Sequence, residues 1–193
     1  ASLALALGEL PAVASADVEV GALGDVRVTL VEGGAAAIWR TNAAQLLLAE
    51  DGRVVGVQSL DAAPRGSLVG LPVIEDLRDT SHDLTVGDAI APTELDAALS
   101  LAFLPASRFG SQATLLSVAL DPTYGFVISS PQVGWRAAFG FYGLDPTETT
   151  ETMAARIASQ ASAVRTLFAS HPETGVAWID ARNPGRVYFR ARG

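Results

Sequence analysis

The last part of the chain, residues 176–192, has the pattern of a β-hairpin. Two runs rich in β-branched and aromatic residues flank Pro184 and Gly185, and a Pro-Gly pair suits the central positions of a type II turn. Side chains alternate between the two faces of a strand, so the second run has one apolar and one basic face. The apolar face holds Val187, Phe189 and Ala191, and the basic face holds Arg186, Tyr188, Arg190 and Arg192. Any fold of this chain must therefore offer a core to one side of its last strand.

This last strand is expected at the edge of a sheet, because no later segment follows to cover its free hydrogen-bonding side. The chain has a net charge of −8, yet the four arginines after residue 181 are accompanied by no acid, so the preceding part carries −12. Two interpretations follow. The arginines are gatekeepers that protect an exposed edge from aggregation, or the edge is a docking site for an acidic partner.

The composition excludes several kinds of chemistry. The chain of 193 residues is 49% apolar, which is enough for a sizeable core, and it contains no cysteine. All 13 basic residues are arginine, so a P-loop lysine and a Schiff-base lysine are excluded. The acidic balance argues against nucleic acid as a partner. No apolar run approaches the ~18–20 residues of a membrane helix, and the opening segment lacks the features of a signal peptide.

The order of the expected elements predicts an α+β fold. A short helix (2–9) and two strands (16–20, 26–30) come first. Strands follow at 35–40, 45–49, 53–57 and 71–74, and Asp51-Gly52 predicts a hairpin turn between the second and third of these. A helix (93–104) precedes a meander of strands (114–120, 126–129, 133–139). Because neighbouring strands are joined as hairpins, we expect a mainly antiparallel sheet with two helices packed on one face.

The second of these helices is expected over residues 146–170. Asp145 suits the N-cap, Pro146 the first helical position and Glu148 the third, which together form a capping box. Met153, Ile157, Val164 and Phe168 form an apolar stripe, which Gln160 interrupts. His171-Pro172 ends the helix.

Several short motifs, in this order, resemble the extracytoplasmic part of the bacterial divisome protein family FtsQ, also called DivIB. Residues 10–18 match the family phrase Leu-Pro-x-Val-x-x-Ala-x-Val. Residues 32–39 keep the acid, one alanine and the tryptophan of Glu-x-x-Pro-x-Ala-x-Trp but lack its proline. A loose Leu-x-Asp-x-x-Gly-x-Val hairpin (48–54) and a Leu-Pro pair (71–72) follow. Residues 179–187 match Ile-Asp-x-Arg-x-Pro-Gly-Arg-Val in every fixed position.

This resemblance covers nearly the whole chain and implies a fold, a location and a function. Residues 1–36 would be the end of a POTRA-like domain, reduced to one helix and two strands, and residues 37–193 the FtsQ-type β domain. The membrane anchor and the first half of the POTRA domain would precede residue 1, and the protein would lie on the extracytoplasmic side of the cytoplasmic membrane. The partners would be divisome proteins of the FtsB or DivIC type, with FtsL.

The resemblance also implies where such a partner binds. It would add a strand to the edge at residues 186–192, with Tyr188 as an apolar anchor. The acids of the partner would meet the arginines of the hairpin. The expected partner-binding residues are Arg182, Arg186, Val187, Tyr188, Phe189 and Arg190. Asn183 stands where the family can have an aromatic residue.

Catalytic chemistry finds little support in the sequence, and we expect no enzyme activity, metal or cofactor. His82 and His171 lack metal-ligand spacing. The acids Glu75, Asp76 and Asp79, and likewise Glu148 and Glu151, are interpreted as solvated or helix-start charges. Trp39, Trp135 and Trp178 are expected in the core. The alternative function is a secreted hydrolase or small-ligand binder, which a deep pocket with convergent acids or a histidine would favour over a shallow surface beside a free strand.

Overall fold

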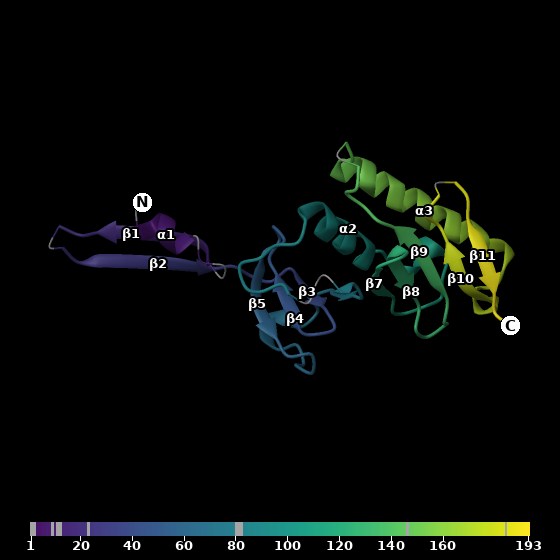
Figure 1. Cartoon of the computed structure of the whole chain (residues 1–193), viewed down its shortest axis with the longest axis horizontal. Helices are drawn as coiled ribbons and strands as arrows, with labels where there is room; N and C mark the ends of the chain where they lie inside the picture. The colour runs from purple at the N-terminus through teal and green to yellow at the C-terminus, as the bar shows by residue number, and fades with distance from the viewer. Residues whose placement is uncertain are drawn as a thin grey trace.

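The chain has an α+β fold with a two-stranded arm and a larger body (Figure 1). The computed structural model describes residues 3–8, 10, 13–22, 24–79, 83–145, 147–183 and 185–193. The helices are α1 (Leu3–Gly8), α2 (Pro92–Ala102) and α3 (Thr150–Ser170). The strands are β1 (Val13–Val20), β2 (Val26–Glu32), β3 (Ala37–Arg40), β4 (Gln45–Leu48), β5 (Val54–Gln58), β6 (Val73–Asp76), β7 (Ser117–Asp121), β8 (Gly125–Ser129), β9 (Arg136–Gly140), β10 (Val176–Asp180) and β11 (Tyr188–Ala191).

The arm consists of α1 and the antiparallel pair β1–β2, which form a sheet of their own. The predicted helix and two strands ahead of residue 36 are therefore confirmed. Figure 1 shows the arm extending away from the body. Several large apolar side chains of the pair are exposed: Val20, Val26, Val28, Leu30 and Val31.

The body is built on one nine-stranded sheet with the order β11-β10-β9-β8-β7-β6-β3-β4-β5. The predicted β4–β5 hairpin and the β7–β8–β9 meander are antiparallel, as expected. Three pairs are parallel: β3–β6, β6–β7 and β9–β10. Parallel neighbours require a crossover connection, and α2 connects β6 to β7 while α3 connects β9 to β10. The sheet is thus mainly antiparallel, with parallel pairs where a helix or a hairpin intervenes in the chain.

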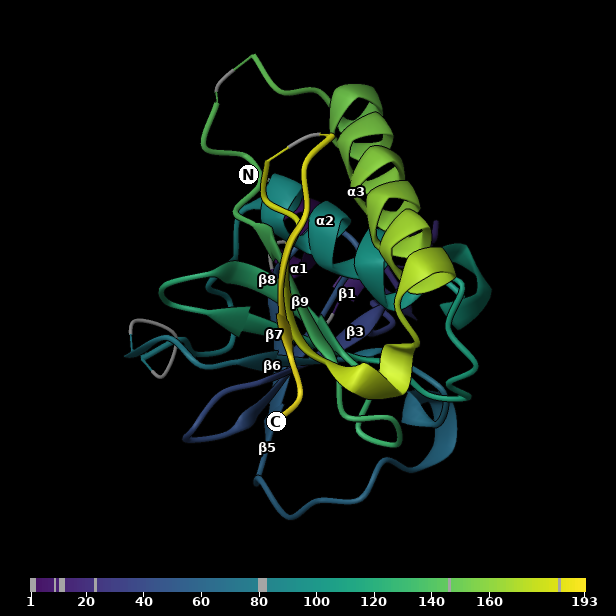
Figure 2. The same cartoon turned by 90° about the vertical axis from the view of Figure 1, so that its right-hand side faces the viewer.

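Helices α2 and α3 pack on the same face of this sheet (Figure 2). The main core lies between the two layers and contains alternate residues of the central strands, such as Phe126 and Ile128 of β8. From α3 it contains Met153, Ile157 and Val164, three members of the predicted stripe. The opposite face of the sheet carries the intervening residues and has no helix over it in Figure 2.

The predicted polar interruption of α3, Gln160, is a buried connection to the sheet. Its side-chain amide donates to the carbonyls of Phe139 (2.8 Å) and Ala181 (2.9 Å), and its oxygen accepts from the hydroxyl of Tyr142 (2.7 Å). Burial raises the pKa of Tyr142 well above its usual range, so this hydroxyl stays a donor. The glutamine therefore satisfies a carbonyl near the end of β9 and one directly after β10, and it fixes α3 beside the terminal hairpin.

The predicted N-cap of α3 is wrong. The carboxylate of Asp145 accepts from the amide and hydroxyl of Thr147 (2.8 and 2.7 Å), and Glu148 accepts from the amide of Gly143 (2.7 Å). Both acids thus bind within the preceding turn, which competes with helix capping. The helix begins at Thr150, and Thr149 forms a reciprocal capping box with Thr152. Pro146, the expected first helical residue, lies outside the described residues.

This correction has a direct test. Thr149→Ala removes the acceptor of the Thr152 amide and should lower the free energy of unfolding by about 1 kcal/mol. Asp145→Ala is the matched control and should change it much less, because its contacts are local and exposed. Urea unfolding of the two variants measures both. A larger loss for Asp145→Ala would restore the cap that the sequence suggested.

Candidate docking edge and arginine–aromatic surface

The terminal hairpin is present, and β11 is the edge strand of the nine-stranded sheet. The amide of Arg186 donates to the carbonyl of Asn183 (3.1 Å), and Gly185 has a φ of 74°. A positive φ at the third position of this turn is what a type II turn requires, and it explains the glycine. Pro184 lies outside the described residues. No other strand of the described chain covers the outer side of β11, so the prediction of a terminal edge strand is confirmed.

The backbone of β11 presents alternate residues to the outside. The amide of Arg192 donates inward to the carbonyl of Gly175 (2.8 Å). Amides two residues apart along an antiparallel strand point the same way, so those of Tyr188 and Arg190 also face β10. On the other side of β10, the amide of Ala181 donates to the carbonyl of Ala138 in β9. The odd-numbered backbone groups of β10 therefore face β9 and the even-numbered ones face β11, which supports the same assignment. The outward N–H and C=O groups therefore belong to Phe189 and its odd-numbered neighbours. We call this outer side of β11 the docking edge.

Side chains of the last strand divide between the two faces as predicted. Val187 packs against the main core, and the ring of Phe189 lies 4.6 Å from the ring of His171 at the end of α3. Phe189 remains 40% exposed. Tyr188 is 58% exposed on the other face, opposite Asp180 of β10. The docking edge is thus supported from the helix side and bears an exposed aromatic on the other.

Arg182, which was expected to meet the partner's acids, is held by an acid of its own chain. Its guanidinium makes two hydrogen bonds to the carboxylate of Asp180 (2.9 and 2.6 Å), and its amide makes a third (3.1 Å). The Arg182 side chain holds the pKa of Asp180 below its usual range, and the same pair raises the pKa of Arg182. The pair fixes the beginning of the turn, and it leaves less free charge at Arg182 than the sequence suggested.

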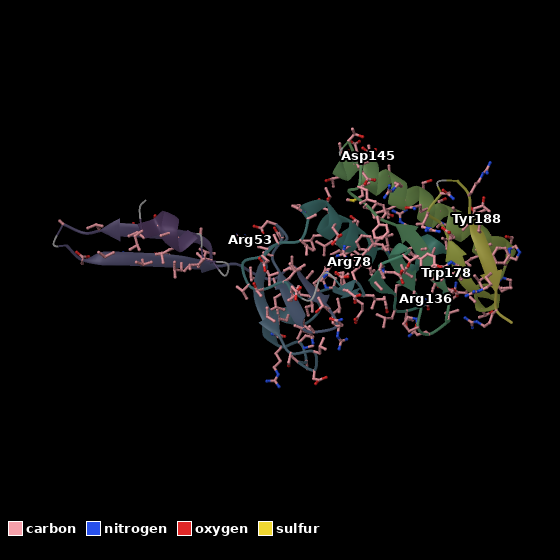
Figure 3. The ribbon with its side chains drawn as sticks, in the orientation of Figure 1. Arg53, Arg78, Arg136, Asp145, Trp178 and Tyr188 are labelled. Atoms are coloured by element: carbon pink, nitrogen blue, oxygen red, sulfur yellow. The ribbon has the colours of Figure 1, made fainter. Side chains whose placement is uncertain are left out.

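The face of the sheet opposite the helices carries a group of residues that the sequence analysis missed. The rings of Tyr124 and Trp178 lie 4.8 Å apart, and the guanidinium of Arg136 lies 5.4 Å from the centre of the Trp178 ring. Together with Arg190 these side chains line a shallow recess. We call these four residues the arginine–aromatic surface. Figure 3 shows Arg136, Trp178 and Tyr188 gathered near the terminal strands.

Trp178 is partly exposed on this surface, so its predicted core position is wrong. Trp39 and Trp135 are fully buried, as expected. The signal was available in the sequence, because alternation around Ile179 puts Trp178 and Asp180 on the face away from the core. Arg136 and Tyr124 had no such signal, since their approach to Trp178 depends on the pairing of β9 with β10 and on the turn after β7.

Positive charge at this end of the sheet is not neutralised by the protein itself. Six arginines of the described chain form ion pairs: Arg27, Arg40, Arg53, Arg78, Arg156 and Arg182. Within the described residues no carboxylate reaches ion-pair distance of Arg136, Arg186, Arg190 or Arg192. A net attraction for acids thus remains along the docking edge and the arginine–aromatic surface.

The acids that the sequence suggested as solvated charges include one that is buried. Asp76 is 2% exposed and accepts a hydrogen bond from the indole of Trp39 (2.8 Å). Its carboxylate also forms an ion pair with Arg78 (2.8 Å). Arg78 forms a second ion pair with Glu94 of α2 (2.7 Å). Burial alone lowers the pKa of Arg78, but its hydrogen bonds to the two carboxylates outweigh burial and raise it. This network joins β6 to α2 and has a structural role.

The other candidate chemical groups do not converge. His171 contacts Ser170 and Phe189, and His82 lies outside the described residues. In the ranges that the structure describes, no cluster of three histidine or acidic side chains is arranged to hold a metal ion. The groove between α2 and α3 is lined by Leu104, Ile157 and small residues, with Arg108 and Arg165 at its sides.

The sequence was compared with family models and with curated proteins. No family model matches the sequence, and no curated protein matches it. Over the described residues, no helix combines the length and the apolar character needed to cross a membrane.

Proposed function

We propose that this chain is a non-catalytic scaffold that binds an extended, acidic segment of another protein by adding it as a strand to the docking edge. The observation that carries the proposal is the coincidence of a sheet edge that no described strand covers with arginines that have no carboxylate partner among the described residues. Main-chain hydrogen bonds to Phe189 and its odd-numbered neighbours would supply the attachment. The neighbouring arginines would select acidic partners and speed their association.

The proposal extends to the biological setting that the sequence motifs suggest. A protein of the FtsQ or DivIB type would hold its partners on the extracytoplasmic side of the membrane during cell division. The partner would be a single-pass coiled-coil protein of the FtsB or DivIC type, with FtsL. The motif match at residues 179–187 supports this, as does the arrangement of a helix and two strands ahead of a large sheet. The shallow recess beside a free strand favours a docking surface over an enzyme pocket.

The proposal is tested with a synthetic peptide. The probe is the acidic extracytoplasmic segment of the FtsB/DivIC-type protein encoded in the same genome, labelled with fluorescein and titrated with the purified chain. Saturable binding that weakens as salt is added is expected, because the arginines supply part of the attraction. Absence of binding at low salt, or equal binding of a peptide with the same composition in scrambled order, would contradict the proposal.

Tyr188 is the expected apolar anchor of this complex. Tyr188→Ala should weaken peptide binding by about 1–3 kcal/mol if the exposed ring becomes buried under the partner. The free energy of unfolding should change little, because the ring is 58% exposed in the free chain. Fluorescence anisotropy gives the affinity and urea unfolding gives the stability. Unchanged affinity would remove Tyr188 from the binding site while leaving the docking edge in place.

A further inference from the structure

Three residues on adjacent strands form a row across the sheet, beside the docking edge. Arg136 of β9 is the pairing partner of Trp178 of β10, and Trp178 is the pairing partner of Arg190 of β11. All three side chains belong to the face opposite the helices, and they line one recess with Tyr124. A strand added to the docking edge would bring its own side chain to the end of this row, next to Arg190.

The row is prepared to receive a carboxylate. The guanidinium carbon of Arg136 lies over the Trp178 ring, at 5.4 Å from its centre. Tyr124 packs on Trp178, and Arg182 lies 5.3 Å from the Tyr124 ring. A cation–π contact holds a guanidinium beside a ring without using up its N–H groups, which remain available to an acceptor. Arg136 and Arg190 have no carboxylate partner among the described residues, so an acid entering the recess would meet two unpaired donors.

From this geometry we infer that the arginine–aromatic surface is a carboxylate subsite, which selects an aspartate or glutamate of the bound segment. The inference rests on the proposed function, since the same partner would occupy the docking edge and the subsite. An acidic side chain near the residue opposite Arg190 would bind the N–H groups of Arg136 and Arg190, and its aliphatic part would lie on Trp178. The docking edge would thus hold the backbone, and the subsite would fix which residue of the partner faces Arg190.

The experiment is a double-mutant cycle with the peptide probe described above. Each acid of the peptide is replaced singly by its amide, and each peptide is titrated with the wild-type chain and with Arg136→Gln. Arg136→Gln should weaken binding of the unmodified peptide about tenfold or more, as expected for the loss of a hydrogen bond between two charged groups. Replacing one acid by its amide should cause at least this loss, and with that peptide Arg136→Gln should cause no further loss. Arg108→Gln, at the groove between α2 and α3 on the helix side, is the matched control and should leave affinity unchanged.

Trp178 provides a second measurement. Trp39 and Trp135 are fully buried, so quenching of tryptophan fluorescence by acrylamide reports mainly on Trp178. Bound peptide should protect Trp178, and the peptide lacking the coupled acid should protect it less. Trp178→Phe should remove the quenchable signal and confirm the assignment.

The outcomes separate the two proposals. If the unmodified peptide does not bind the wild-type chain, the proposed function fails and the subsite fails with it. If the peptide binds and no acid is coupled to Arg136, the subsite is overturned while the docking edge stands. If inorganic phosphate alone protects Trp178 as well as the peptide does, and the peptide shows no coupled acid, the recess is a general anion site and the inference is also overturned.

Discussion

Replacing Arg78 by methionine is expected to lower the free energy of unfolding by about 3–5 kcal/mol. Asp76 is buried, and its carboxylate is compensated by Arg78 and by the indole of Trp39. Methionine keeps most of the apolar volume but removes the guanidinium that pairs with this buried carboxylate. The same change releases Glu94, which connects α2 to the sheet. Denaturant unfolding, followed by circular dichroism, measures the loss.

An exposed ion pair of the same chain provides the control. Arg53→Met breaks the ion pair between Arg53 and Asp51, whose side chains are 36% and 55% exposed, respectively. This change should lower the free energy of unfolding by less than about 1 kcal/mol. Figure 3 labels both arginines. Equal losses for Arg78→Met and Arg53→Met would mean that the buried network does not carry the stability that its geometry implies. A variant with both Asp76→Asn and Arg78→Met should recover part of the loss, because the buried charge is gone.

Phe189→Pro is expected to weaken peptide binding at least about 100-fold, the largest effect of any change at the docking edge. The Phe189 amide is the central outward donor of β11, and a carbonyl of the added strand left without it costs about 1–3 kcal/mol. The proline ring adds a steric obstacle to the approaching strand. Titration of the labelled peptide, monitored by anisotropy, measures this effect.

Two variants isolate the contribution of the amide. Phe189→Ala removes the ring that contacts His171 but keeps the N–H group, and it should retain most of the affinity. Arg190→Pro removes a donor that faces β10, so it should detach β11 and lower stability. Comparable affinities for Phe189→Pro and Phe189→Ala would show that the partner does not pair with the backbone of this strand.

Local patterns in the sequence determined the elements and their faces. Alternation in residues 187–191 predicted that Val187 faces the core while Tyr188 lies on the other face, and the hairpin pattern predicted the terminal strand. The apolar stripe of residues 153–164 predicted the buried face of α3, including the position of Gln160. These features depend only on residues close together in the sequence, because the periods of a strand and of a helix are the same in every protein.

Contacts between distant segments decided the rest. The parallel insertion of β6 between β3 and β7 places Asp76 beneath α2, where an acid that looks solvated in the sequence becomes buried. The pairing of β9 with β10 brings Arg136 to Trp178 from a position far along the chain. Thr149 caps α3 because Asp145 and Glu148 are already bound in the preceding turn. In each case the partner is chosen by strand order and loop path, which hydrophobic periodicity does not encode. The sequence by itself thus determined where this protein has a strand edge, and only the tertiary structure decided which charges lie free beside it.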